Sequence, residues 1–187
     1  AWKKATVLGR LGDAPWGDVF TARAAGATPA AELTVPPGFR IELLRSAGPR
    51  EGSWVCLTVD DAGRLYICPQ QAVPESGFAR DSGWGGIFRA TIGEKGNISA
   101  WERVPVPIGG CMGMLWTGGV LFLSGQGPEG HAIYRCTDTD GDSLPDAWTV
   151  FKKVPGGGGE HGAHAIVRGP DGHLYIAMGN STPLVAR

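Results

Sequence analysis

The sequence has few charged residues and no excess of either sign. Of its 187 residues, 17 are Lys or Arg and 18 are Asp or Glu, which gives a formal net charge of -1. A protein that binds nucleic acid through counterion release needs a basic surface, and this composition does not supply one. Hydrophobic residues make up 42% and charged residues 19%, which excludes intrinsic disorder as the main state.

Long apolar runs are also absent. Runs such as the one from Val120 are much shorter than the roughly 20 residues that a membrane-spanning helix needs. No charged-then-apolar signal peptide opens the chain, so we expect a soluble protein with no membrane span. The chain begins with Ala1 rather than Met, and we expect it to be processed or a fragment.

Cysteine is scarce, and its spacing excludes several kinds of site. The four cysteines, Cys56, Cys68, Cys111 and Cys136, match neither CxxC nor CxxCH. The sequence therefore indicates no zinc ribbon, thioredoxin-type site or haem attachment. Cys56 and Cys68 lie symmetrically about a predicted hairpin turn and could face each other across it. A disulfide between them is one alternative, and free buried thiols are the other.

Three segments share a pattern of apolar strand, glycine-containing turn and apolar strand. They span 53–70, 111–126 and 164–180, and their second strands align as GRLYI, GVLFL and GHLYI. The unit recurs about every 54 residues, a period within the range of four-stranded repeat units. GIFRATI with WERVP, and AIYRCTD with FKKVP, follow the first two copies, so each complete unit is expected to hold two hairpins.

The second strands of these units are apolar on both faces. In Leu65, Tyr66 and Ile67, for example, the aliphatic residues point to one face and the aromatic residue to the other, so both faces must be buried. Four-stranded antiparallel blades that pack between two neighbours form a β-propeller, whereas a β-sandwich would alternate polar and apolar residues more cleanly. The predicted fold is all-β, a β-propeller that is incomplete in this chain.

The repeat predicts about two and a half blades. The first covers Ser53–Val104, the second covers Cys111–Val154, and the third starts at Ala163 and stops after its second strand. FRIELLRSA from Phe39 is predicted as the outer strand of a ring-closing blade. Since so few blades cannot close a ring, the chain is expected to be an incomplete propeller or to need partner chains.

The predicted domain organisation follows from this count. Residues 1–32, which are Ala- and Gly-rich with little periodicity, are interpreted as a linker or the tail of a preceding domain. Residues 33–187 are interpreted as the N-terminal part of a β-propeller domain.

The loop DTDGDSLPD, between two predicted strands of the second blade, is rich in acids. Asp138, Asp140, Asp142 and Asp146 occupy its positions one, three, five and nine. Carboxylates at this spacing can converge on one hard cation. The loop departs from the EF-hand pattern and is similar to the calcium loops of thrombospondin type 3 and dockerin repeats. The sequence predicts a structural calcium site, with an Asp/Gly-rich turn that needs no metal as the alternative.

A glycine-rich stretch leads into Glu160, His161 and His164 just before the third blade. The first strand of a propeller blade lines the central channel, so residues at its entrance are expected to face a ligand site. Histidine titrates near neutrality, which makes His161 a candidate general base that Glu160 could tune. His164 is a candidate metal ligand or a core histidine, and a structural role is the alternative for each histidine.

These segments resemble one known family. VPPGFRIELLRSA, DDAGRLYICPQ, GGIFRATI, the DTDGD loop and GGGEHGAHAIVRGPDGHLYIAMGN are similar to large planctomycete and verrucomicrobial proteins described as membrane-bound dehydrogenases, or haem-binding β-propellers. The similarity covers about Leu33 to Leu184, and its most specific parts are EHG(A/P)H and GPDG. Many full-length members end in a haem-bearing CxxCH domain, and this chain has no such motif.

That family is in turn similar to the soluble quinoprotein glucose and sorbosone dehydrogenases, six-bladed propellers that use pyrroloquinoline quinone (PQQ) and calcium. The resemblance implies that His161, eight residues before the GPD at 169–171, takes the hydroxyl proton of a sugar while hydride passes to the quinone. Glu160 falls where those enzymes carry an acid. Asn180 replaces their supporting aspartate, and His164 replaces a glycine at the cofactor's place.

The resemblance therefore implies part of an exported oxidoreductase, periplasmic or at the cell surface, that acts on a sugar or other alcohol. It also implies further blades and a cytochrome domain outside this chain. An alternative of a different class is a non-catalytic, calcium-stabilised propeller that binds carbohydrate or a protein partner. A third is a metal or haem bound by the histidine pair.

Overall fold

The computed structural model describes residues 9–10, 13, 26–48, 53–70, 86–156 and 161–183. Regular structure in these residues is all-β apart from one short 3-10 helix, and its elements are η1 (Ala30–Glu32), β1 (Ser53–Val59), β2 (Leu65–Gln70), β3 (Ile87–Ile92), β4 (Ile98–Val104), β5 (Gly109–Thr117), β6 (Val120–Gly127), β7 (Gly130–Thr137), β8 (Ala147–Lys153), β9 (Ala163–Arg168) and β10 (Leu174–Met178). Among the described residues, no helix has both the length and the hydrophobicity that crossing a bilayer requires.

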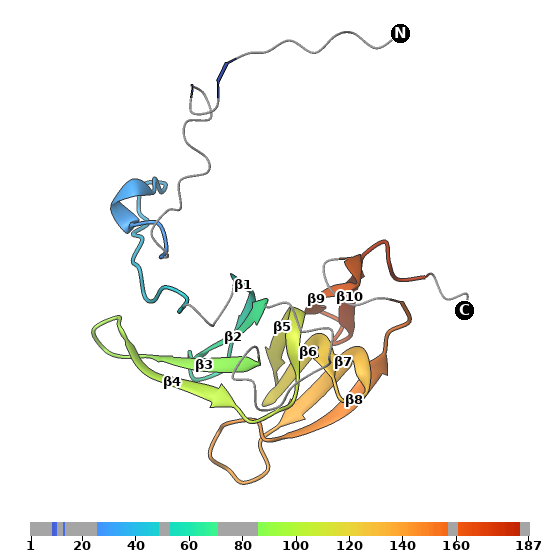
Figure 1. The fold of residues 1–187 in the computed structure, drawn as a ribbon. Helices are drawn as coiled ribbons and strands as arrows, with labels where there is room; N and C mark the ends of the chain where they lie inside the picture. Colours follow the sequence, from blue (N-terminus) through green and yellow to red (C-terminus); the bar gives the residue numbers. More distant parts are fainter. Residues whose placement is uncertain are drawn as a thin grey trace, which may run out of the picture.

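The strands form three antiparallel sheets in sequence order. Sheet A is β1-β2-β3-β4, sheet B is β5-β6-β7-β8, and sheet C is the hairpin of β9 and β10 (Figure 1). This arrangement confirms the two predicted twin-hairpin units, and the described part of the third unit holds its first two strands. Gly118 and Gly119, with φ of 59° and 75°, make the two-residue turn between β5 and β6, because a tight hairpin turn of this kind requires positive φ at both positions.

The sheets pack face to face through their first strands. β5 contacts β1 and β2 on one side and β9 on the other, so sheet B lies between sheets A and C, as Figure 1 shows. Tyr66 of sheet A stacks on Trp116 of sheet B with ring centroids 5.3 Å apart. On the other face, the buried Ser124 hydroxyl of β6 donates a hydrogen bond to Ala163 O of β9 at 2.7 Å.

The central sheet confirms the predicted burial of both faces. Leu121 and Leu123 belong to the core between sheets A and B, whereas Phe122 belongs to the core between sheets B and C. All three side chains are buried. One strand therefore contributes to two hydrophobic layers because its side chains alternate between the faces of the sheet.

The outer faces of sheets A and C are less buried than the two faces of the central sheet B. Large apolar side chains are exposed on β1 and on sheet C, namely Val55, Leu57, Val59, Val167, Tyr175 and Met178. Tyr175 is 53% exposed, so the prediction that both faces are buried is wrong for the third repeat. The physical reason is that no described layer packs against the outer face of sheet C.

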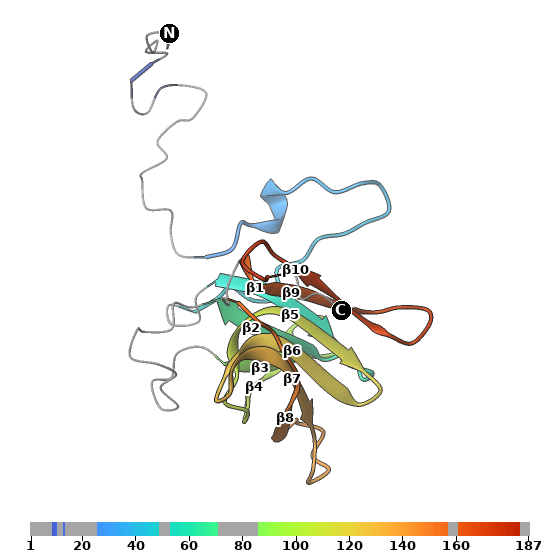
Figure 2. The same cartoon turned by 90° about the vertical axis from the view of Figure 1, so that its right-hand side faces the viewer.

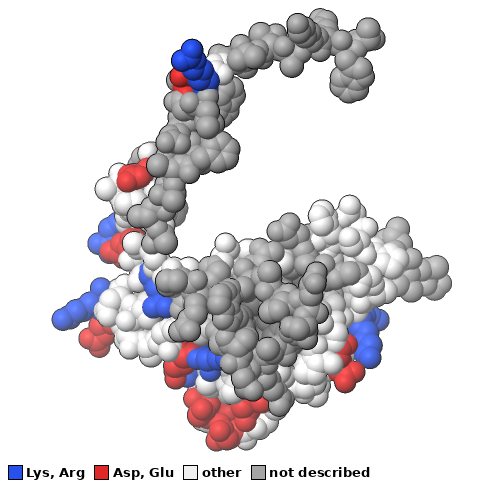
Figure 3. Space-filling model, in the orientation of Figure 1, with Lys and Arg blue, Asp and Glu red and all other residues white. Residues whose placement is uncertain are grey.

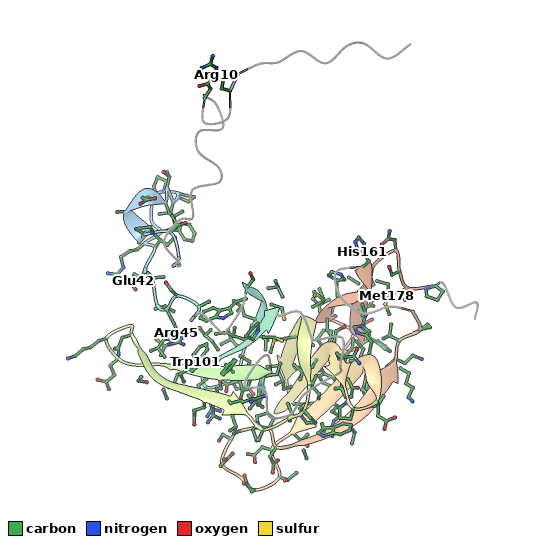
Figure 4. All side chains as sticks on the ribbon, viewed as in Figure 1. Arg10, Glu42, Arg45, Trp101, His161 and Met178 are labelled. Atoms are coloured by element: carbon green, nitrogen blue, oxygen red, sulfur yellow. The ribbon has the colours of Figure 1, made fainter. Side chains whose placement is uncertain are left out.

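The segment FRIELLRSA from Phe39, predicted as a strand, forms no strand in the described chain. A strand requires a partner for its ladder of hydrogen bonds, and no described strand pairs with residues 39–47. Instead, the Arg45 guanidinium lies 4.2 Å from the centroid of the Trp101 ring (Figure 4). The assignment of residues 1–32 as a linker stays a prediction, because most of them lie outside the described residues.

We predict that Gly113→Ala weakens the contact between sheets B and C. A Cβ atom at this position of β5 would overlap the backbone carbonyl of His164 in β9, so the two sheets would have to separate. The expected loss is about 1–3 kcal/mol in the free energy of unfolding, measured by urea denaturation. Gly26→Ala is the control, because its Cβ would meet only Ser46 Oγ at 4.0 Å. Equal stability of the two variants would contradict the close packing.

Candidate functional site

His161 and Asn180 lie together at one end of sheet C. His161 precedes β9 and Asn180 follows β10, and these ends are adjacent because the two strands are antiparallel. The Ser181 N–H donates to His161 O at 2.8 Å, and His161 Nδ1 lies 2.8 Å from Asn180 Oδ1. Figure 4 shows His161 at the edge of the described sheets, close to Met178.

This hydrogen bond selects one tautomer of the neutral imidazole. An amide oxygen only accepts hydrogen bonds, so Nδ1 of neutral His161 carries the proton. Nε2 then presents a lone pair, and the residue is exposed, so Nε2 can accept a proton from a bound molecule. Asn180 orients the ring without adding negative charge.

Glu160 and His164 were also predicted as residues of this site. Glu160 falls outside the described residues, so its relation to His161 stays a prediction. His164 lies within β9, beyond the hairpin end that holds His161. Burial and, next, electrostatic interaction with His164 lower the pKa of His131. Nε2 of His131 is buried and has no hydrogen-bond partner among the described residues.

The acidic loop connects β7 and β8, where the sequence placed it. Asp138 accepts hydrogen bonds from the backbone N–H of Gly141 and of Ser143, both at 2.8 Å. These bonds, with that of Gly141 the strongest, lower the pKa of the Asp138 carboxyl. The backbone of the loop thus holds a carboxylate in its ionised form.

Three of the four predicted ligands converge. Asp138, Asp140 and Asp142 each offer a carboxylate oxygen, and the three oxygens lie within 4.8 Å of one another. Figure 3 shows the acidic side chains gathered at the end of the molecule where this loop projects. Such a group of hard oxygen ligands suits calcium.

Asp146 takes a different place in the loop. Its two carboxylate oxygens accept hydrogen bonds from the backbone N–H of Thr139 at 2.8 Å and from the Thr139 hydroxyl at 2.7 Å. Asp146 N in turn donates to Thr137 O at 3.0 Å. Asp146 therefore closes the base of the loop and lies outside the group of three converging carboxylates.

The loop also links sheet B to sheet A. Ser143, the one non-glycine residue with positive φ in the described chain at 68°, directs its carbonyl to Arg89 of β3. Arg89 Nη1 donates to Ser143 O at 2.6 Å, and the same buried guanidinium pairs with Glu102 at 2.9 Å. The conformation of the acidic loop is thus coupled to the contact between the two sheets.

The two candidate sites are separate. The β7–β8 loop projects from one end of the described sheets, and the β9–β10 hairpin lies at the other in both ribbon views (Figures 1 and 2). A cation held by the loop would therefore act on structure and would not contact a molecule bound at His161.

Sequence reasoning did not single out Arg89, Ser143 or His131. Arg89 and Ser143 are 54 residues apart, and no local pattern marks their contact. His131 stands at the start of an ordinary strand, where only the packing of the sheets reveals its burial.

Comparison of the chain with models of protein families, with curated proteins and with solved structures finds no match in any of the three. The geometry of the described residues is therefore what bears on function.

Proposed function

We propose that the three sheets are successive blades of a β-propeller and that His161 is the general base of an oxidoreductase acting on a sugar or other alcohol. The observation that carries the proposal is the 2.8 Å hydrogen bond between His161 Nδ1 and Asn180 Oδ1. The proposal includes export, further blades and an electron-accepting cytochrome domain, which the family resemblance implies.

The packing of the sheets supports the propeller. Sheets A, B and C follow one another through their first strands, as blades do around an axis. The apolar side chains on the outer faces of sheets A and C, such as Leu57 and Tyr175, are where further blades of the same or of partner chains would pack. A closed ring would bury these faces, because every sheet would then lie between two neighbouring sheets.

The role of His161 follows from its tautomer. Nε2 accepts the hydroxyl proton of the substrate, and the resulting imidazolium keeps its Nδ1–H bond to Asn180. The carbinol carbon loses hydride to a two-electron acceptor, and the alcohol becomes a carbonyl compound. Because an amide supplies no charge, Asn180 positions the ring but stabilises imidazolium less than an aspartate would.

PQQ is the acceptor that the resemblance suggests, but the described residues at His161 do not make a site for it. The quinone carries three carboxylates, and the His161–Asn180 pair offers an imidazole and a neutral amide rather than the cations that such a ligand requires. The groups that would bind the quinone would therefore lie in further blades.

We also propose that the acidic loop binds calcium. The carboxylates of Asp138, Asp140 and Asp142 converge and repel one another without a cation. A bound cation would remove this repulsion and hold the loop in the conformation that presents Ser143 O to Arg89. Its role is to stabilise the contact between sheets A and B.

Calcium is predicted to raise the melting temperature. At a concentration about one hundred times its Kd, calcium should raise Tm by about 5 °C or more relative to EDTA, because it binds only the folded loop. Asp140→Asn should lose most of this shift, since it keeps an oxygen but removes the charge. Glu94→Gln, a change outside the loop, is the matched control and should keep it. A Tm that is the same in calcium and EDTA would refute the site.

The catalytic proposal is tested with protein that contains the complete ring, supplied with PQQ, calcium, a panel of sugars and a dye acceptor. His161→Ala should lower turnover by about 10²–10⁴-fold, the usual contribution of a general base. His173→Ala is the control, because that side chain is 79% exposed in a turn. Circular dichroism checks that both variants fold.

Two results of this assay would reject the catalytic role. One is full activity in His161→Ala. The other is wild-type protein that binds sugars without turnover, which would favour the non-catalytic alternative.

A further inference from the structure

The three sheets divide their side chains between two faces in the same way. In the second strand of each sheet, the central aromatic residue points toward the next sheet along the chain, and the aliphatic residues beside it point the other way. Tyr66 of sheet A stacks on Trp116 of sheet B, and Phe122 of sheet B packs in the core against sheet C. Leu121 and Leu123 pack in the core against sheet A. We call the face toward the next sheet the forward face and the opposite one the backward face.

A forward face packs on a backward face in both contacts between consecutive sheets. Between sheets A and B, the free thiol of Cys56 donates a hydrogen bond to Cys111 O at 3.1 Å. Between sheets B and C, Phe122 of the forward face belongs to the same buried cluster as Ile166 of the backward face. Each contact joins the first strands of the two sheets, β1 with β5 and β5 with β9.

One face of each kind has no sheet packed on it among the described residues. The forward face of sheet C carries Val167 and Tyr175, which are paired across β9 and β10 and are each more than half exposed. The backward face of sheet A carries Leu57, which is 62% exposed, and Val59. Sheets A and C lie on opposite sides of sheet B (Figure 1), so these two faces of one copy point away from each other.

The residues on these faces hold positions that the internal contacts already use. Tyr175 takes the place of Tyr66 in the aligned second strands GHLYI and GRLYI. Val59 takes the place of Trp116, because each of them pairs with the first leucine of the following strand. The contact of Tyr66 with Trp116 therefore has an equivalent in which Tyr175 of one copy meets Val59 of another.

We propose that the forward face of sheet C docks on the backward face of sheet A in a second copy of this chain. The second copy is the partner that fits, because it offers the same kind of face that this chain already packs twice. The contact is head to tail, so each added copy leaves one face open until the assembly closes into a ring. The proposal rests on the part of the proposed function that treats the sheets as successive blades, and it does not depend on catalysis by His161.

Only part of the backward face of sheet A is covered in one copy. The Arg45 guanidinium lies over the ring of Trp101 (Figure 4). Residues 42–45 and sheet A enclose a groove of about 360 Å³, with Leu57 and Ile67 in its wall. The side of the face that β1 forms is open, as the exposure of Leu57 shows. The incoming β9 would lie against β1, so that first strands meet as they do within the chain.

The test measures the mass of the chain by sedimentation velocity over a range of concentrations. The unaltered chain should change from one copy to two or more as the concentration rises. Leu57→Lys and Val167→Lys should each raise the Kd by about tenfold or more, because the contact would bury an unpaired ammonium group. Leu33→Lys is the matched control and should associate as the unaltered chain does, since Leu33 is also exposed but lies outside the sheets.

A mixture of the two variants distinguishes a head-to-tail contact from a symmetrical one. Leu57→Lys keeps the forward face of sheet C, and Val167→Lys keeps the backward face of sheet A. An equimolar mixture should therefore form a species of two copies at a concentration where each variant alone is a single copy. A contact of one face with itself predicts instead that one variant associates alone and that mixing adds no new species.

Three results would overturn the proposal. They are an unaltered chain that stays a single copy up to about 100 μM, a mixture that forms no species of two copies, and a variant that alone associates like the unaltered chain. Circular dichroism checks that the variants fold, and the first result needs no variant. None of these results bears on the turnover of His161→Ala, so failure of the docking is distinguishable from failure of the catalytic proposal.

Hydrogen exchange gives a second readout on the unaltered chain. In a single copy the forward face of sheet C is open, and the second copy would cover it. The amides of β9 should therefore exchange more slowly as the concentration rises. Exchange in β9 that is the same in dilute and concentrated solution would contradict docking on this face.

Discussion

The structure depends on the packing of apolar sheets against one another through their first strands. The strand β6 shows the constraint most clearly, because Leu121 and Leu123 enter one core and Phe122 enters the other. A strand with two apolar faces is stable only between two layers. Sheets A and C provide these layers for sheet B, and each of them then has an outer apolar face of its own.

The same packing positions each candidate site. His161 and Asn180 come together because β9 and β10 pair at that end of the hairpin. The acidic loop of sheet B reaches sheet A through the hydrogen bond from Arg89 to Ser143 O. Cys111 contacts Cys56 and Cys68 where β5 meets β1 and β2. Groups from distant parts of the sequence are thus brought together by contacts between sheets, while each sheet is built from local hairpins.

This division explains what the sequence could and could not predict. Hairpins are local, so the repeat of apolar strands and glycine turns predicted the strands of sheets A, B and C. The converging carboxylates of Asp138 and Asp142 are also local, within one short loop. The exposure of Tyr175 and the irregular chain from Phe39 were not predicted, because both depend on which layer is present beside them. The contact of Cys111 with Cys68, 43 residues away, likewise has no sequence signal.

The most direct test of the central claim is hydrogen–deuterium exchange of the backbone amides, resolved by strand. If sheet B is held between two layers, the amides of β5 and β6 should exchange only through the opening reaction of highest free energy. They should be the slowest in the chain to exchange. Those of β9 and β10, whose outer face is open, should exchange faster. Exchange in β6 that is as fast as in β10 would contradict the account.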